Sequence, residues 1–314
     1  MGDQSRGGDT EAGPEYADYL ESLRTNRNFT APVVAAAVEA IALGLPDGPP
    51  RLLDAGTGVG GALPELVNLV RDKGRGNGVL VAVDVDEQAV GAARTLVDDQ
   101  GWTSVVDFRV ADLRDVAQRA AATGERFDAV WSADVVWPTT FDDPAAVVRT
   151  LAEALAPGGT LALFTANYYQ SMLLPGHSRL ERLIRTASEL TWSLPDDGPI
   201  HYERSGAWLR QAGLENVTLQ VFPLSACVHE PAARAYLEQI AWPEMRHAVA
   251  SHGRAAGMSR EDVARAEALL DPAGEDWIGA DPDAFVVLPM LLWTGRAGWP
   301  SMASVSARRD RSAP

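Results

Sequence analysis

Apolar and polar residues alternate in two different rhythms between Arg51 and Phe164. Short runs that are apolar almost throughout, as at 79–84, 105–110 and 127–132, predict buried strands. The stretches between them repeat apolar residues at helical spacing, and one helix is expected at 87–96. Strands alternating with helices predict an α/β fold with a doubly wound, mostly parallel sheet. In such a sheet the ligand-binding loops follow the carboxyl ends of the strands.

The pattern changes on both sides of this region. Before it, residues 16–43 have helical spacing with a polar interruption near Asn26, which predicts two helices ahead of the first strand. Beyond Phe164 we expect a helix at 205–212, an alternating strand at 216–222 and an apolar last strand at 284–294. Further helices are expected at 231–240 and 260–270.

These elements divide the chain into consecutive segments around one α/β core. The segments are a disordered leader (1–14), an N-terminal helical lid (15–46), the α/β core (47–166), a first insertion (167–202), a core helix and sixth strand (203–224), a second helical insertion (225–283), the last core strand (284–296) and a disordered tail (297–314). The two insertions are the expected walls of a substrate pocket.

The segment Leu52–Gly61, LLDAGTGVGG, joins an apolar strand to a carboxylate and a glycine turn. Glycines at 56, 58 and 60 let the backbone turn sharply and approach a ligand closely. Gly56, Gly58 and Gly61 also satisfy the spacing of a dinucleotide-binding turn. Asp54 favours another ligand, because a carboxylate at that place would repel a pyrophosphate and attract an ammonium group. A cationic ligand without phosphate therefore fits better.

This turn resembles the first motif of the class I S-adenosylmethionine-dependent methyltransferases, an apolar strand followed by D/E-x-G-x-G-x-G. The matching residues are Asp54, Gly56, Gly58 and Gly60. Later landmarks follow in the family's order: the strand ending at Asp84, the strand ending before Asp112, the strand at 127–132 and the Pro157-Gly158-Gly159 turn with its strand. The resemblance covers residues 45–170 closely and implies a seven-stranded Rossmann-like methyltransferase fold.

The resemblance implies S-adenosylmethionine as the cofactor. Asp84 matches the carboxylate that holds both ribose hydroxyls in the family, and Asp112 matches an acid or amide next to the adenine amino group. Asp86 is the expected cap of the helix at 87–96, which leaves Asp84 to the cofactor. The expected cofactor-binding residues are Asp54, Gly56, Thr57, Gly58, Gly60, Asp84, Val85, Ala111, Asp112, Leu113 and Ser132.

Composition restricts the acceptor and the location. The formal net charge of −16 argues against nucleic acid as a partner, because a polyanion requires basic surface. The apolar runs are too short to cross a bilayer, and the N-terminus lacks the pattern of a secretory signal, so a cytoplasmic monomer or homodimer is expected. Cys227 is the only cysteine, which excludes an intrachain disulfide, and we expect it to be buried on a strand. No metal site is expected.

A small aromatic or hydrophobic methyl acceptor is predicted. Trp137, Tyr168 and Tyr169 follow the fourth and fifth strands, where the family holds the reacting methyl group, and they are the expected substrate-binding residues. Core packing is the alternative role for any single aromatic residue. The acceptor atom is left open among oxygen, nitrogen and carbon.

A general base is needed by a hydroxyl acceptor but not by an amine that binds neutral. His177 is the first candidate, because it lies in a Pro-Gly turn after the fifth strand, and Asp134 after the fourth strand is the second. Helix capping or loop ordering is an equally good explanation of Asp134. His201 and His229 are weaker candidates.

Within the class, the chain is similar to the ubiquinone and menaquinone biosynthesis methyltransferases, a branch that includes enzymes of bacterial secondary metabolism. This similarity implies a role in secondary metabolism. One alternative stays open, namely an enzyme of the same fold that keeps S-adenosylmethionine bound while it catalyses a cyclisation or rearrangement. The cofactor motifs would be identical in that case, and only the mass of the product separates the two.

Overall fold

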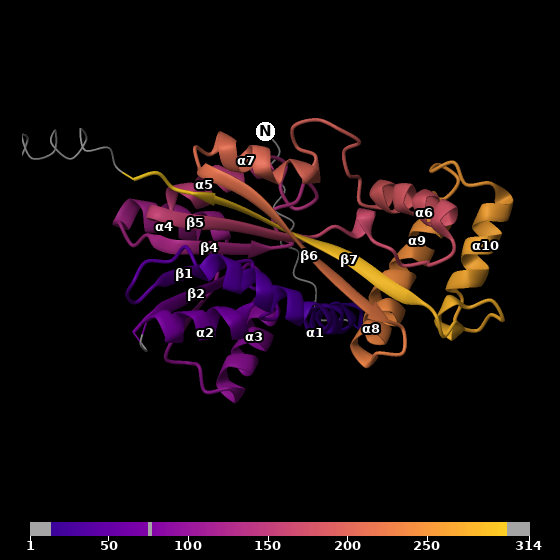
Figure 1. Ribbon diagram of the computed structural model, residues 1–314, viewed down its shortest axis with the longest axis horizontal. Helices are drawn as coiled ribbons and strands as arrows, with labels where there is room; N and C mark the ends of the chain where they lie inside the picture. The colour runs from indigo at the N-terminus through magenta and orange to yellow at the C-terminus, as the bar shows by residue number, and fades with distance from the viewer. Residues whose placement is uncertain (1–13, 75–76, 300–314) are drawn as a thin grey trace, which may run out of the picture.

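The computed structural model describes residues 14–74 and 77–299, which form an α/β fold around one seven-stranded sheet (Figure 1). The strands lie in the order β3-β2-β1-β4-β5-β7-β6. β7 runs antiparallel to both of its neighbours, and the other pairings are parallel. The strands are β1 (Arg51–Ala55), β2 (Val79–Asp84), β3 (Val106–Val110), β4 (Phe127–Ala133), β5 (Leu155–Ala166), β6 (Glu215–Cys227) and β7 (Phe285–Arg296). The predicted fold class is confirmed.

Helices cover both faces of the parallel half (Figure 1). One face is packed by α1 (Pro14–Ala42), α2 (Leu63–Gly74) and α3 (Glu87–Asp99), which bury residues such as Val38, Val67 and Val97. The other face is packed by α4 (Leu113–Thr123), α5 (Pro144–Glu153) and α7 (Ser205–Gln211). Because both faces are covered, the central strands are apolar nearly throughout rather than alternating.

The remaining helices gather beyond the parallel half, at one end of the long strands β6 and β7 (Figure 1). They are α6 (Ser178–Thr191), α8 (Pro231–Tyr236), the π-helical segment η3 (Leu237–Ala241), α9 (Trp242–His252) and α10 (Arg260–Leu270), with the short 3-10 turns η1 (Tyr168–Gln170), η2 (Tyr202–Arg204) and η4 (Ile278–Ala280). The two predicted insertions therefore meet in space, and α6 packs against α9.

The N-terminal region differs from the prediction, because α1 is one helix and not two. Thr25, Phe29, Ala37 and Ile41 are buried at helical spacing, so a single apolar stripe continues past the polar residues near Asn26. Packing of that stripe outweighs the weak helix propensity of the asparagines.

Further predictions need correction. Strand β6 extends to Cys227, five residues beyond the predicted end at 222, because its whole length pairs with β7. Cys227 lies on this strand as expected, but it is exposed and not buried, since β6 is the edge of the sheet. Most of the predicted disordered leader (1–14) and tail (297–314) lies outside the described residues, at 1–13 and 300–314. Pro14 instead begins α1, and Ala297 is ordered by backbone hydrogen bonds with Gly158 and Gly159. None of the described helices is long and apolar enough to cross a membrane.

Candidate active site

The glycine turn after β1 lies at the carboxyl edge of the sheet. Its geometry is set by positive φ angles of 90° at Gly56, 51° at Gly58 and 87° at Gly60, which favour glycine. The backbone N–H groups of Gly56 and Thr57 both donate to the Val83 carbonyl, at 2.9 and 2.8 Å. A Cβ atom on Gly56 would lie 2.2 Å from the Val135 side chain. The loop after β4 therefore rests directly on the glycine turn.

Asp54, at the end of β1, is 2% exposed. Burial raises the pKa of its carboxyl group to about 7; the nearby Thr57 hydroxyl opposes the rise, and the Asp84 charge adds to it. Asp54 Oδ2 and Thr57 Oγ1 nevertheless have no aligned hydrogen-bond partner among the described residues. A buried acid without a cationic partner is costly, so this site favours a bound cation.

Asp84, at the end of β2, is oriented by two backbone donors. Gly58 N–H donates to its Oδ2 at 2.8 Å, and Asp86 N–H donates to its Oδ1 at 3.1 Å. Each carboxylate oxygen keeps a lone pair for a further donor. Asp86 caps α3 through bonds from the Gln88 and Ala89 N–H groups, which confirms its predicted role as the helix cap.

Asp112 has partners of its own within the chain. Its carboxylate caps α4 by accepting from Arg114 N–H, and the Arg114 guanidinium forms an ion pair with it. These bonds lower the pKa of Asp112. The Asp112 carboxylate is thus already engaged at the place where the family has an adenine contact.

The other predicted cofactor residues lie at the same edge of the sheet. Ser132 is buried and donates to the Ala55 carbonyl at 2.9 Å, which ties β4 to the end of β1. Val85 is an exposed apolar residue following β2, and Ala111 N–H donates to the Asp84 carbonyl. Leu113 is buried at the start of α4.

Helix α1 covers part of this edge from within the same chain. Arg27 Nη1 donates to the Val59 carbonyl in the glycine turn at 3.3 Å. Desolvation and the carboxylates of Asp84 and Asp86 raise the pKa of Tyr19 on the same helix. The N-terminal helix therefore lies over the cofactor edge of its own subunit.

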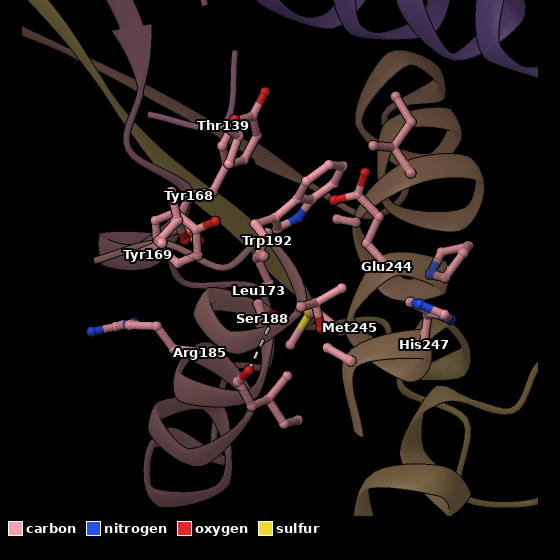
Figure 2. Close-up of a pocket in the computed structure, with 18 of the residues that line it drawn as sticks. Thr139, Tyr168, Tyr169, Leu173, Arg185, Ser188, Trp192, Glu244, Met245 and His247 are labelled. Carbon is pink, nitrogen blue, oxygen red and sulfur yellow. Dashed lines mark hydrogen bonds between the residues drawn. The ribbon is translucent and has the colours of Figure 1, made fainter. Parts of the chain in front are cut away.

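A cavity of about 610 Å³ adjoins the loop after β4. It is lined from segments that are far apart in the sequence, including α1, the loop after β4, η1, α6 and the α8–η3–α9 helix (Figure 2). Its lining includes Leu23, Asp134, Trp137, Tyr168, Tyr169, Ile184, Arg185, Trp192, Tyr236, Ile240, Glu244 and His247. The predicted first and second insertions both contribute to its wall.

Asp134 lines this cavity in an unusual backbone conformation, with φ at 54°. Its N–H donates to the Phe164 carbonyl, and its Oδ1 accepts from Thr165 Oγ1 and from Ala166 N–H, both at 2.9 Å. Asp134 is exposed at the cavity, and desolvation by the surrounding wall raises the pKa of its carboxyl group to about 6 despite the two hydrogen bonds. A group with that pKa suits proton transfer near neutral pH.

Stacked aromatic rings form one side of the cavity. Trp137 stacks on Tyr202 with ring centroids 5.2 Å apart, and Tyr169 lies 5.2 Å from the same ring. Tyr168 and Tyr169 both line the cavity, and burial raises the pKa of each phenol. The predicted substrate-binding residues Trp137, Tyr168 and Tyr169 therefore share one cavity with Asp134.

The histidine candidates for a base lie elsewhere. His177 precedes α6 and is not in the cavity wall, so the structure does not bring it together with Asp134. His201 accepts from Glu203 N–H and stacks on Tyr202, which is a structural role. His229 is exposed after β6 and is also absent from the wall.

Several wall residues were missed by sequence reasoning, above all Tyr236 and Glu244. They follow the spacing Tyr236, Ile240, Glu244 along one face of the continuous α8–η3–α9 helix. A tyrosine and an acid on an otherwise apolar helix face were the available signal, since such positions ordinarily face a core.

Comparison with known proteins agrees with this geometry. Residues 52–159 match the family described as a methyltransferase domain. A ubiquinone biosynthesis O-methyltransferase of Xanthomonas axonopodis pv. citri is 30% identical over 187 residues, which cover 58% of this chain and 67% of the relative. The protein of the same name from Xanthomonas oryzae pv. oryzae is 31% identical over 189 residues, with the same coverage.

Among solved structures, a SAM-dependent methyltransferase from Thiobacillus denitrificans in complex with S-adenosyl-L-homocysteine is similar over 91% of this chain and 100% of that chain. Its identity is 18% and its TM-score 0.49.

The sequence relatives align over 67% of their own length, and the matched family spans the glycine turn, Asp84, Asp112 and β4. The buried Asp54 carboxylate without a hydrogen-bond partner at Oδ2 and the positive φ angles of the turn glycines also fit a sulfonium nucleoside that carries an amino group. The chain belongs to the S-adenosylmethionine-dependent methyltransferases, and S-adenosylmethionine is its cofactor.

Proposed function

We propose that the enzyme transfers the methyl group to a small aromatic or hydrophobic molecule bound in the 610 Å³ cavity. The observation that carries this proposal is the loop after β4. Its Val135 rests on the glycine turn, while its neighbours Asp134 and Trp137 line the cavity. One short loop thus connects the cofactor edge to a pocket of suitable size for a small molecule.

Asp54 would attract the amino group of the cofactor, and the oriented Asp84 carboxylate would accept from its ribose hydroxyls. Gly56, Gly58 and Gly60 would allow close approach of the backbone. Thr57, Val85, Ala111, Leu113 and Ser132 complete the proposed cofactor site at the strand ends. Asp112 would reach the adenine only if it shared its carboxylate with Arg114.

S-adenosylmethionine supplies a methyl group already activated by a sulfonium, so the chain mainly has to align the acceptor and exclude water. The rings of Trp137 and Tyr169 in the cavity wall, both packed against Tyr202, support a flat acceptor. For a hydroxyl acceptor, Asp134 would take the proton at Oδ2, because its Oδ1 already accepts two hydrogen bonds. We propose Asp134 rather than His177 as the base, since only Asp134 lines the cavity.

The relatives in Xanthomonas are named O-methyltransferases, which supports oxygen as the attacked atom. Ubiquinone precursors as a class are one candidate acceptor, and products of secondary metabolism are another. The second rests on the similarity to a methyltransferase branch that includes enzymes of secondary metabolism.

The test is incubation with S-adenosylmethionine and a panel of phenols, catechols and aromatic amines, read by mass spectrometry. A product heavier by one methyl supports the proposal, whereas conversion without a mass gain would support the cyclisation or rearrangement alternative. Asp134→Asn keeps a residue type that tolerates positive φ, and we expect kcat to fall roughly 10²–10⁴-fold for a hydroxyl acceptor. In the wild type, kcat/KM should rise as the pH increases through about 6, because Asp134 acts as a base only when deprotonated.

The matched control is Asp142→Asn, an exposed acid of the same loop outside the cavity wall. It should leave kcat and its pH profile unchanged. A similar fall in both variants, or an unchanged pH profile in Asp134→Asn, would remove Asp134 as the base.

A further inference from the structure

Acidic side chains outnumber basic ones among the described residues that line the cavity. Acidic side chains come from Asp134, Glu181 and Glu244, whereas Arg185 and His247 are the basic ones among the described lining residues. Glu181 is committed to the protein, because its Oε1 accepts from the Leu173 and Leu174 N–H groups. Asp134 is likewise held by Thr165 and Ala166.

Glu244 differs from these two acids. Its side chain is exposed at the cavity, and its carboxylate has no hydrogen bond or ion pair with any residue in the described part of the chain. Arg185 does not compensate it, since Figure 2 shows the guanidinium pointing away from Glu244 on the opposite side of the cavity. Desolvation by the cavity wall raises the pKa of Glu244, with no opposing contribution from a nearby cation.

Tyr236 supplies a second, independent sign of a missing polar ligand. Its side chain is 0% exposed and lines the cavity, yet its hydroxyl has no hydrogen-bond partner in the described structure. Tyr236, Glu244 and Asp134 all line the same cavity. A buried hydroxyl without a partner is unusual in a folded protein, and a ligand group at this point would satisfy it.

Aromatic faces surround the same acid. Tyr168, Trp192 and Tyr236 line the cavity together with Glu244. Figure 2 shows the Glu244 side chain reaching from α9 toward the side of the cavity where Trp192 lies. A carboxylate among aromatic rings is the arrangement that binds an alkylammonium group, by a charged hydrogen bond and by attraction to the ring faces.

We infer that the methyl acceptor carries a protonated amine, which Glu244 and the Tyr236 hydroxyl hold among the rings of Tyr168 and Trp192. This inference rests on the proposed function, because it assumes that the acceptor occupies this cavity. The amine anchors one end of the acceptor at α9, and the atom to be methylated lies at the Asp134 end, next to the glycine turn. The substrate class is an amine-bearing aromatic molecule.

The test uses protein saturated with S-adenosylhomocysteine and three probes of similar shape: phenethylamine, 2-phenylethanol and phenylacetate. Calorimetry at about pH 8 keeps the alkylamine protonated. We expect phenethylamine to bind roughly tenfold or more tighter than 2-phenylethanol, since hydrogen bonds to charged groups are the stronger ones. Phenylacetate should bind weakest.

Glu244→Gln should remove the preference for phenethylamine and leave 2-phenylethanol unchanged. The matched control is Glu267→Gln, an exposed acid on α10 outside the cavity wall, which should keep the preference. Tyr236→Phe should reduce the preference without abolishing it. Equal or weaker binding of the amine, no binding of it up to its solubility limit, or a preference that survives Glu244→Gln would each overturn the inference.

The failure of this inference is distinct from that of the proposed function. Suppose that S-adenosylhomocysteine binds and phenols gain a methyl group, while amines neither bind nor compete. The proposed methyl transfer is then supported, and the inference that the acceptor carries a protonated amine is refuted. If no acceptor of any charge gains a methyl group, the proposed function fails first, and amine binding then identifies a ligand site without transfer.

Discussion

The cofactor edge and the acceptor cavity of this enzyme are built in different ways. The cofactor edge uses short runs of consecutive residues at the ends of adjacent strands, with glycine conformations and backbone hydrogen bonds at its centre. The cavity wall draws single residues from α1, the loop after β4, η1, α6 and α9. Its chemistry therefore depends on how distant segments pack together.

The two regions also differ in how their acids are held. Asp84 is oriented by two backbone N–H groups, so its position follows from the local turn. Glu244 is placed by the packing of α9 against α6 and α10, and its carboxylate has no partner among the residues that the structure describes. The comparison suggests that substitutions at the cofactor edge act through local geometry, whereas substitutions in the cavity act through charge and shape.

The largest expected effect comes from Gly56→Ala. The new Cβ would meet Val135 at 2.2 Å in a backbone with φ at 90°, so the variant suffers a clash and a strained φ. Gly124→Ala is the control, because its φ of 79° imposes similar strain with nothing within 4 Å. In both variants the strained φ should lower the free energy of unfolding by about 1–2 kcal/mol. Calorimetry should show roughly hundredfold weaker binding of S-adenosylhomocysteine to Gly56→Ala alone, the equivalent of about 3 kcal/mol. Equal affinities would show that the turn tolerates a side chain.

A smaller effect is expected for Asp84→Ala. Loss of hydrogen bonds to a charged group costs about 1.5–3 kcal/mol, so affinity for S-adenosylhomocysteine should fall roughly ten- to hundredfold. Asp86→Ala removes the adjacent helix cap and should cost about 1 kcal/mol of stability with little change in affinity. If Asp84→Ala changes the affinity of the cofactor-free protein for phenethylamine, the cofactor edge and the cavity are energetically coupled, and the contrast between the two regions is contradicted.

A third effect concerns stability rather than ligand affinity, and it is a change in how the free energy of unfolding depends on pH. The pKa of Asp54 is raised from 3.8 to about 7, so the folded state binds its proton more tightly than the unfolded state does. The free energy of unfolding without cofactor should therefore fall as the pH rises from about 4 to about 7, by an amount on the order of 2–4 kcal/mol. Asp54→Asn should flatten this dependence and raise Tm at pH values above about 7, measured by thermal unfolding across pH.

The control for Asp54 is Asp72→Asn, an exposed acid on α2, which should leave the pH dependence intact. S-adenosylmethionine should stabilise the wild type more than Asp54→Asn at high pH, because its amino group compensates the buried carboxylate. If the free energy of unfolding of the wild type does not fall between about pH 4 and about pH 7, the raised pKa of Asp54 is contradicted.

Most of the fold and the cofactor edge could be predicted from the sequence. Periodicity located the strands and helices, and the order of Asp54, the glycines, Asp84 and β4 identified the family. Local rules also identified Asp86 as a cap. The prediction of two helices in place of α1 was wrong. Packing of the buried stripe stabilises one continuous helix by more than the low helix propensity of the asparagines destabilises it.

The acceptor site was predicted only in part. Asp134, Trp137, Tyr168 and Tyr169 follow strands, so the topology alone brings them to one edge. His177 also follows a strand, but the start of α6 carries it away from the cavity.

The sequence by itself determined the α/β class, the cofactor and the edge of the sheet at which we propose that it binds, because these depend on periodicity and on contiguous motifs. Only the tertiary structure decided that Glu244 lines the cavity without a partner among the described residues, that Cys227 is exposed and that Tyr236 joins Asp134 and Glu244 in one cavity wall. The physical reason is that burial, pKa and charge balance are properties of the surroundings. Those surroundings come from segments more than a hundred residues apart, from Leu23 through Asp134 to Glu244.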